Sequence, residues 1–379
     1  MGRHYLDHAS TSPARPEVVE AMVPWLSGLL AADPARVHTE GRMARAAVEQ
    51  AREQVAALLG ARSREVVFTS GATEAINAAT WGATRARPGS VVAAAVEHSA
   101  VRDAAARGPV EVPPVDRLGR IDVSALLERV TPGTALVHCQ WANHEVGTLQ
   151  PVAEVVAACR ERGVLVHVDA AAAAGHVPID FRALDADLLS VSAHKLGGPK
   201  GIGALLVRRG LRLPPLLVGG DQERARRAGM ENVPAIVGFG AACAALDVEG
   251  EARAARAGTD RLLAGATAVP GVTAYGDPAG RLPHIVCLGV GGVEAEAVLL
   301  GLDQAGVAAH SGSACSSEAL EPSPVLEAMG VDAERSLRLS VGWSTTDGDI
   351  DAALRALPAI VDRLRRLAPG AEPRPEPGR

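Results

Sequence analysis

The stretch VLVHVDAAAAAGHVPIDFRALDADLLSVSAHKLGGPKGIGALLV, residues 164–207, decides the fold. Three short apolar runs within it predict buried strands over Val164–Val168, Asp187–Val191 and Gly203–Val207. Strands that are apolar throughout, rather than alternating, are typical of a parallel sheet covered by helices on both faces. Such sheets bind ligands beyond the carboxyl ends of their strands. Polar residues at these ends are therefore the first candidates for a site.

Upstream, the same pattern continues back to about residue 65. Further apolar runs predict strands over Glu65–Thr69, Val91–Val96 and Thr134–Cys139. A helix is predicted over Pro151–Arg162, because Pro151 suits a first helical position and the apolar residues after it recur at helical spacing. Strands that alternate with helices predict an α/β domain with a mostly parallel sheet.

Downstream, the pattern changes to that of a smaller α+β domain. Its predicted elements are a helical region after Val233, a strand over His284–Gly289, a helix from Glu294, a strand over Leu337–Val341 and a last helix from Asp347, capped by Thr345 or Thr346. We expect a large domain over residues 15–245 and a small domain made of residues 1–14 and 246–367. The tail at 368–379 is rich in proline and charge, and we predict that it is disordered.

Composition excludes several classes of protein. With 379 residues, 47% of them apolar and 22% charged, the chain has the balance of a globular protein. A net charge of −6 argues against nucleic acid or an anionic membrane as the main partner. The absence of an 18-residue apolar run and of a targeting segment favours a cytoplasmic protein. Five cysteines without a CxxC pair argue against disulfides and against a metal site.

The lysine content is unusual. Only two of the 38 basic residues are lysines, Lys195 and Lys200, and they lie five residues apart. An arginine stays charged, whereas an amine can lose its proton and attack a carbonyl. Chance survival of the pair is the plainer explanation, but the clustering favours a chemical role for at least one of them.

Three of the predicted strand ends carry polar groups that belong together chemically. FTSGATE, residues 68–74, reads as a strand end, a glycine turn and a helix start, where free N–H groups suit a phosphate. Asp169 ends a second strand, and Ser190–Lys195 ends a third. Taken singly, each has a plain alternative, such as a capped helix. Together they supply the amine, the carboxylate and the phosphate cup that pyridoxal phosphate requires, so we predict this cofactor.

Two further residues stand out. His98 follows another strand and is placed to stack on a cofactor ring, with a solvated histidine as the alternative. Cys315 lies in the polar stretch HSGSACSS at residues 310–317, whereas the other four cysteines lie in apolar elements. Thiolate chemistry needs access, so a reactive thiol is the better interpretation. A cysteine protease dyad is disfavoured, because the nearby sequence offers no oxyanion architecture.

Seven segments resemble the cysteine desulfurases, in one order along residues 4–366. They are YLDHASTSP at 5–13, FTSGATE at 68–74, EHSAV at 97–101, VDA at 168–170, SAHKLGGPKGIGAL at 192–205, ENVPAIVGFG at 231–240 and SGSACSSEALEPSPVLEAMG at 311–330. These are pyridoxal-phosphate enzymes with the fold of aspartate aminotransferase, known as fold type I. The resemblance implies a homodimer with its active sites at the subunit interface. It also implies that L-cysteine becomes L-alanine and an enzyme persulfide, whose sulfur passes to an acceptor protein.

The resemblance also implies a role for each matching position. Lys195 holds the cofactor as a Schiff base and moves the substrate's α-proton, Asp169 pairs with the ring nitrogen, and His98 stacks on the ring. The cofactor's phosphate is held or flanked by Ala72, Thr73, Ser192 and His194. Arg338 matches the clamp for the substrate carboxylate, and Cys315 matches the nucleophile that takes the sulfur. Lys200 matches a family lysine to which we assign no catalytic role.

Three positions depart from the family pattern. Where the family has Asn-Asn-Glu, this chain has Asn143-His144-Glu145, so an imidazole at His144 replaces an amide that contacts the cofactor ring. Ala172 replaces a glutamine that hydrogen-bonds the cofactor's phenolate, and Met230 replaces a threonine that reaches the partner subunit's phosphate. A C–S lyase or selenocysteine lyase on the same scaffold is therefore the second hypothesis. A non-catalytic sulfur-carrier subunit is the third.

Overall fold

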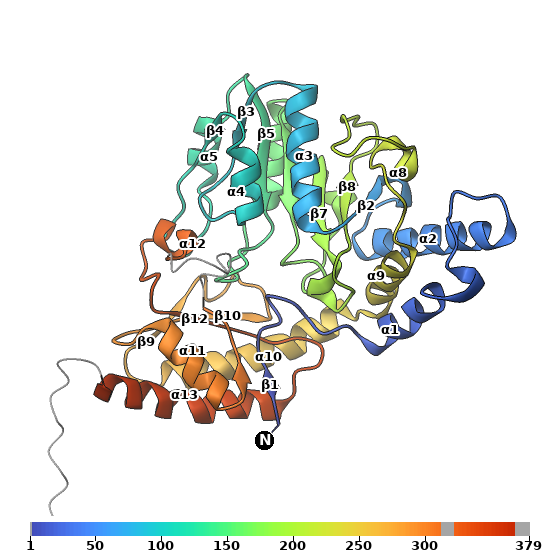
Figure 1. The fold of residues 1–379 in the computed structure, drawn as a ribbon. Coiled ribbons are helices and arrows are strands. Elements are labelled where there is room, and N and C mark those ends of the chain that lie inside the picture. Colours follow the sequence, from blue (N-terminus) through green and yellow to red (C-terminus); the bar gives the residue numbers. More distant parts are fainter. Residues whose placement is uncertain (1, 312–321, 368–379) are drawn as a thin grey trace, which may run out of the picture.

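The computed structural model describes residues 2–311 and 322–367. Its large domain is built on a seven-stranded sheet, which lies between layers of helices (Figure 1). From one edge to the other the strands are β2 (Val66–Thr69), β8 (Gly203–Val207), β7 (Leu188–Ser192), β6 (Leu165–Asp169), β5 (Thr134–Gln140), β3 (Ser90–Val92) and β4 (Val110–Glu111). Only β8 runs antiparallel to its neighbours β2 and β7, and every other pair is parallel. The strands β2, β5, β6 and β7 therefore end on the same side of the sheet.

Helices cover both faces of this sheet, as the apolar strands predicted. On one face α3 (Ala72–Ala86) and α4 (Ser99–Ala105) share a core with Leu136, Leu188 and Leu205 of the strands. The opposite core brings strand residues such as Val137, Val166 and Leu206 together with helices α2 (Thr39–Leu58), α6 (Val152–Glu161) and α9 (Val233–Ala245). Shorter helices complete the domain: α1 (Pro16–Met22), α5 (Val123–Arg129), α7 (Phe181–Leu184), α8 (Gln222–Ala225) and the 3-10 turns η1 (Val23–Trp25), η2 (Gly28–Leu30), η3 (Ser63–Glu65) and η4 (Ala193–Leu196).

Two predicted elements differ from the structure in a way that has a local cause. The strand predicted over Val91–Val96 ends at Val92, because a turn at residues 94–97, closed by a hydrogen bond from Glu97 N–H to the Ala94 carbonyl, leads the chain into α4. The helix predicted from Pro151 begins one residue later, since Pro151 has a ψ of 55°, outside the helical range.

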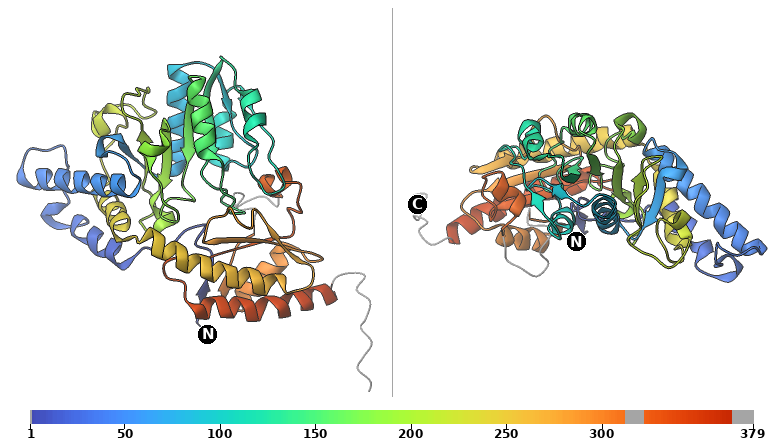
Figure 2. Two further views of the ribbon diagram at one scale, coloured as in Figure 1. Left: turned by 180° about the vertical axis from the view of Figure 1, so that it is seen from behind. Right: turned by 90° about the horizontal axis from the view of Figure 1, so that it is seen from above.

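The small domain has its own sheet and its own hydrophobic core. Its strands pair antiparallel in the order β12 (Ser336–Ser340), β10 (Ile285–Val290) and β9 (Val272–Tyr275), while β1 (His4–Tyr5) pairs in parallel with β11 (Val307–Ala308). The helices α10 (Val248–Thr267), α11 (Ala295–Gln304) and α13 (Asp347–Leu367) pack around them, and α12 (Pro324–Ala328) lies beside the large domain (Figure 2). Of the two caps predicted for α13, Thr346 directly precedes the helix, and its N–H and Oγ1 both donate to the Asp349 carboxylate in the first turn.

One core lies wholly within residues 15–245 and another wholly within residues 1–14 and 246–367, which supports the two domains that we propose. The third core joins them, since it includes Ala9, Ile285 and Leu326 as well as large-domain residues. The four cysteines within the described ranges are free and buried, as predicted. In the same ranges no single helix has the length and hydropathy needed to cross a membrane, and only α9 and α10 together, bent by 76°, meet that test.

Candidate active site

The strand ends open onto one cavity of about 560 Å³ between the two domains. Each of β2, β5, β6 and β7 ends at its margin, and the N-terminal segment and β12 close it from the small-domain side. All the site residues predicted within the described ranges line this cavity: Ala72, Thr73, His98, His144, Asp169, Ser192, His194, Lys195 and Arg338. Cys315 lies outside the described residues.

Lys195 lies in the 3-10 turn η4, directly after β7. Its amine donates a hydrogen bond to the Ala9 carbonyl, so the N-terminal segment passes next to it. The turn ends at Gly197, whose φ of 82° is a left-handed conformation that favours glycine. Lys200 lines the same cavity, so the structure brings both lysines of the chain to one place.

Asp169 is the last residue of β6, and its side chain is held from one side only. Oδ1 accepts hydrogen bonds from Ser190 Oγ and from Ala171 N–H, both at 3.0 Å. Within the described part of the chain Oδ2 makes no hydrogen bond. Two donors thus fix the orientation of the carboxylate, and its second oxygen is left for a ligand in the cavity.

The turn between β2 and α3 forms another wall of the cavity. Gly71, Ala72 and Thr73 carry N–H groups at the start of a 15-residue helix, where the helix dipole favours an anion. Gly203 makes this turn possible, because a Cβ there would lie 2.8 Å from the Gly71 backbone and 2.4 Å from the Val191 carbonyl oxygen. The backbone of the turn thus lies directly against the first residue of β8.

His194 stands near this turn as a neutral imidazole. Burial, together with the charges of Lys195 and Lys200, lowers its pKa to about 4. Its Nδ1 lies 3.2 Å from Thr11 Oγ1. A neutral ring leaves the lysines and the helix start as the groups that would attract a phosphate.

His98 and His144 meet over the strand ends. Their ring centroids are 4.9 Å apart at an interplanar angle of 64°. His98 is fixed at the start of α4, where its Nδ1 accepts a hydrogen bond from Ala100 N–H at 3.1 Å. The imidazole that departs from the family pattern therefore supports the ring predicted to stack on the cofactor, and Ala172 lines the same cavity.

Arg338, on β12, is almost fully buried and held by residues far away in the sequence. Nη2 donates to Ser10 Oγ at 2.6 Å and to Asp7 Oδ1 at 3.1 Å, while Nη1 donates to the His144 carbonyl at 2.9 Å. The sequence patterns did not identify Asp7 and Ser10 as site residues. The only signal for them was their place in the YLDHASTSP segment, since 331 residues separate Asp7 from Arg338.

Two buried carboxyls behind the cavity were also missed. Burial raises the pKa of Glu97 to about 8 and that of Glu145 to about 7. Glu97 accepts a hydrogen bond from Gln140 N–H at 2.7 Å, and Glu145 accepts one from Ser323 Oγ at 2.6 Å. Both residues follow the end of a predicted strand, so the sequence indicated that they lie near the ligand-binding edge of the sheet. It did not indicate that their carboxyl groups are buried.

Met230, the third departure from the family pattern, lies outside this cavity and is 68% exposed. The residues that do line the cavity fit pyridoxal phosphate. They provide an amine, a carboxylate with one open oxygen, an aromatic ring and a helix start with free N–H groups. The cavity volume is in the range of cofactor and ligand sites.

Comparisons with known proteins agree with this chemistry. The family model for class-V aminotransferases matches residues 4–353. A cysteine desulfurase of Trichormus azollae is 43% identical over 378 residues, covering 96% of this chain and 94% of its own length. A cysteine desulfurase IscS of Methanosarcina thermophila is 41% identical and covers 96% and 93%.

Solved structures give the same picture. A NifS-like protein superposes with a TM-score of 0.89 at 30% identity, covering 96% of this chain and all of its own. The protein SspA, solved in complex with cysteine, superposes with a TM-score of 0.80 at 29% identity and covers 90% of this chain and all of its own.

Proposed function

The chain belongs to the class-V aminotransferase family and, within it, to the cysteine desulfurases; on that premise we propose that it uses pyridoxal phosphate to take the sulfur from L-cysteine and release L-alanine. The observation that carries this proposal is the meeting of Lys195, Asp169 and Arg338 around one cavity. These residues come from both domains. They supply an amine, a carboxylate and a guanidinium within reach of one small molecule.

Each wall of the cavity has a part in holding the cofactor. When bound, pyridoxal phosphate supplies an electron sink for bonds at the substrate's α-carbon. Lys195 Nζ would hold it covalently, Asp169 Oδ2 would face its ring nitrogen, and the His98 ring would lie against it. Its phosphate would be held at residues Ala72, Thr73, Ser192 and His194.

Two residues, Arg338 and Lys195, bind the substrate and transfer its proton. Arg338 carries a guanidinium, a group suited to bind a carboxylate with two hydrogen bonds. In this structure its Nη2 donates to Asp7 and Ser10, so a substrate carboxylate would take over these two hydrogen bonds. Lys195 Nζ is the base for the proton on the substrate's α-carbon, because an amine in the cavity can accept it whereas a guanidinium cannot.

Cys315 would take the sulfur atom. Its thiolate attacks the sulfur of cysteine, the C–S bond breaks, and the α-amino acid leaves as alanine after a proton replaces the sulfur. One cysteine and one enzyme thiol thus give one alanine and one persulfide, so the step needs no outside oxidant. The outer sulfur atom of the persulfide then passes to an acceptor protein. Incubation of the enzyme with sulfur-labelled cysteine and a cell extract would identify that acceptor as the protein that gains label.

The products of the reaction test this function. The protein with pyridoxal phosphate and cysteine should release alanine and leave a persulfide on Cys315, detected by mass spectrometry. Cys315→Ser should still bind cofactor and cysteine but release no sulfide, while Cys243→Ala, which removes a buried thiol, should behave as wild type. Pyruvate and ammonia would instead indicate a C–S lyase. A protein that binds no cofactor would favour a sulfur-carrier subunit.

The working form that we propose is a homodimer in the cytoplasm. Apolar side chains exposed in two segments support a second subunit: Val19, Val23, Leu26, Val37 and Met43 in the first, and Leu217, Val218 and Met230 in the second. The free, buried cysteines suit a reducing compartment. Light scattering of the purified protein tests the dimer, and a monomeric mass would contradict it.

A further inference from the structure

Glu74 lies in the first turn of α3, beside the turn proposed to bind the cofactor's phosphate. Its Oε2 accepts a hydrogen bond from Ser70 N–H at 2.8 Å, and the residue lines the cavity. This bond closes the loop between the end of β2 and the helix. Glu74 therefore fixes the shape of residues 70–73.

The charge of Glu74 opposes the function of the turn that it shapes, because a carboxylate repels a phosphate nearby. Arg227 counters this charge with two hydrogen bonds, from Nε to Oε1 at 2.9 Å and from Nη2 to Oε2 at 3.2 Å. Burial alone would raise the pKa of Glu74, but the hydrogen bonds from Arg227 and Ser70 outweigh burial and lower the pKa. The carboxylate thus stays ionised and paired.

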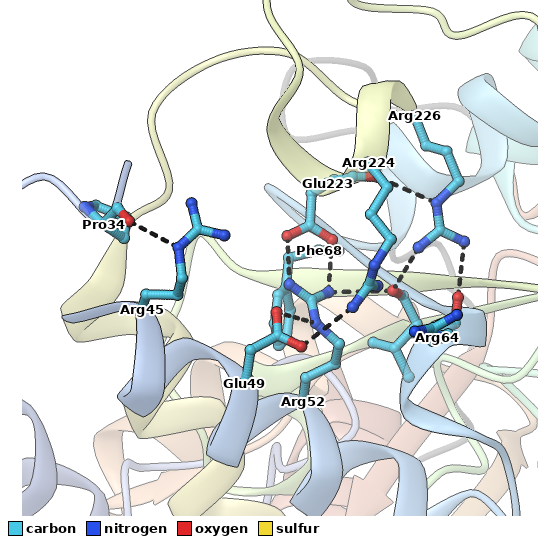
Figure 3. Close-up of polar contacts among 10 residues, drawn as sticks. Pro34, Arg45, Glu49, Arg52, Arg64, Phe68, Glu223, Arg224 and Arg226 are labelled. Atoms are coloured by element: carbon cyan, nitrogen blue, oxygen red, sulfur yellow. Dashed lines mark hydrogen bonds and ion pairs between the residues drawn. The ribbon is translucent and has the colours of Figure 1, made fainter. Parts of the chain in front are cut away.

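Arg227 is presented by a segment with an unfavourable backbone. Glu223, Arg224 and Ala225 have φ values of 50°, 60° and 59°, a left-handed conformation that non-glycine residues avoid. The buried Glu223 fastens the segment, since its carboxylate accepts two hydrogen bonds from Arg52 at 2.6 and 2.7 Å and one from Phe68 N–H at 2.9 Å (Figure 3).

Arg226 fastens the next residue of the segment to the start of β2. Its guanidinium donates to the carbonyls of Glu223 at 3.1 Å, Arg64 at 3.0 Å and Val66 at 3.2 Å (Figure 3). The segment is thus attached to β2 through Arg226 and to α3 through Arg227. These are the two elements that the turn at residues 70–71 connects.

We propose that Arg227 is a positioning residue for phosphate binding: through Glu74 it fixes the turn at residues 70–73 and neutralises the carboxylate beside the anion. The proposal rests on the proposed function, which places the cofactor's phosphate at this turn. It adds a residue that does not line the cavity and acts on it through another side chain.

The test is a set of charge variants in the full-length protein freed of cofactor. Binding of pyridoxal phosphate and, separately, of inorganic phosphate is measured by calorimetry. Arg227→Gln should weaken both affinities about ten-fold, because Glu74 becomes an unpaired anion. Adding Glu74→Gln should restore most of the loss, since glutamine keeps an oxygen acceptor for Ser70 N–H without the charge. Equal weakness of the single and double variants would overturn the proposal.

A matched control comes from the same segment. Arg224 pairs with Glu49 at 3.1 Å, and both side chains are 43% exposed. Arg224→Gln should leave both affinities unchanged, and a loss equal to that of Arg227→Gln would contradict a specific role for Arg227.

Two further results keep the test decisive. If Arg227→Gln fails to fold, Glu74→Gln alone is measured; it should bind inorganic phosphate more tightly than wild type, and equal or weaker binding would overturn the proposal. If the wild type binds inorganic phosphate but not pyridoxal phosphate, the proposed function is wrong. The phosphate affinities of the variants then still test the positioning role of Arg227.

Discussion

The two lysines share one cavity but differ in the role that we assign to them. Lys195 follows β7 and contacts Ala9, whereas Lys200 lies five residues further on and is exposed. Lys195→Arg should abolish covalent attachment of the cofactor and lower turnover by roughly 10²–10⁴-fold, because a guanidinium cannot act as nucleophile or base at neutral pH. Borohydride reduction followed by mass spectrometry measures the attachment. Lys200→Arg is the control and should be mild; the reverse result would exchange the two roles.

Most of the candidate site could be predicted at the scale of single residues. Asp169, Ser192 and Lys195 follow apolar runs, so the rule that parallel sheets bind ligands at their strand ends was enough to gather them. The partners of Arg338 could not be found in this way. Asp7 and Ser10 reach it from the other end of the chain, and only the folded small domain brings them together.

The left-handed backbone at residues 223–225 leads to a prediction for the stability of the segment around α8. Ala225 has a φ of 59°, where a residue with a Cβ is disfavoured by about 1–2 kcal/mol and glycine is not. Ala225→Gly should therefore raise the free energy of unfolding by about 1 kcal/mol and leave the affinity for pyridoxal phosphate unchanged. Urea denaturation measures the first quantity. Ala228→Gly, at a buried position without a positive φ, is the control and should not stabilise; equal effects of both would contradict backbone strain.

The helices and strands that the sequence predicted correctly are those that a run or a periodic pattern of apolar residues is enough to identify. The six predicted strands of the large sheet are all present, because buried strands in parallel sheets carry continuous apolar runs. The short strands β1, β4 and β11 have two residues each and left no pattern to find. The direction of β8 was also not predicted, since an antiparallel strand inside such a sheet is as apolar as its neighbours.

For the whole molecule, the buried histidines predict a loss of stability in acid. Burial lowers the pKa of six of them: His8, His138, His167, His176, His194 and His284. Their stabilising contribution is complete above pH 6.5, the unfolded value, and is lost as the pH falls toward the folded values, about 4 for His176. Glu97 and Glu145 act in the opposite sense, because their raised pKa values favour the folded state as the pH falls toward 4.5.

Six histidines outweigh two carboxyls, so unfolding near pH 5.5 should take up about four protons. Each proton changes the free energy of unfolding by about 1.4 kcal/mol per pH unit. Urea denaturation at pH 7, 6 and 5 should therefore show a steep decline. His176→Phe keeps a ring against His284 and should reduce the slope by about one proton. A flat profile would contradict the prediction.

Because both lysines of the chain lie at one cavity, chemical modification of lysine can report on that cavity. An acylating reagent that reacts with ε-amines has, apart from the amino terminus, only the lysines of this cavity to modify. Because Lys200 is exposed and Lys195 is partly buried, acylation of Lys195, located by peptide mass spectrometry, is the footprint of cavity occupancy. The same reagent coupled to a solid support would tether the molecule at this cavity rather than at scattered points of its surface.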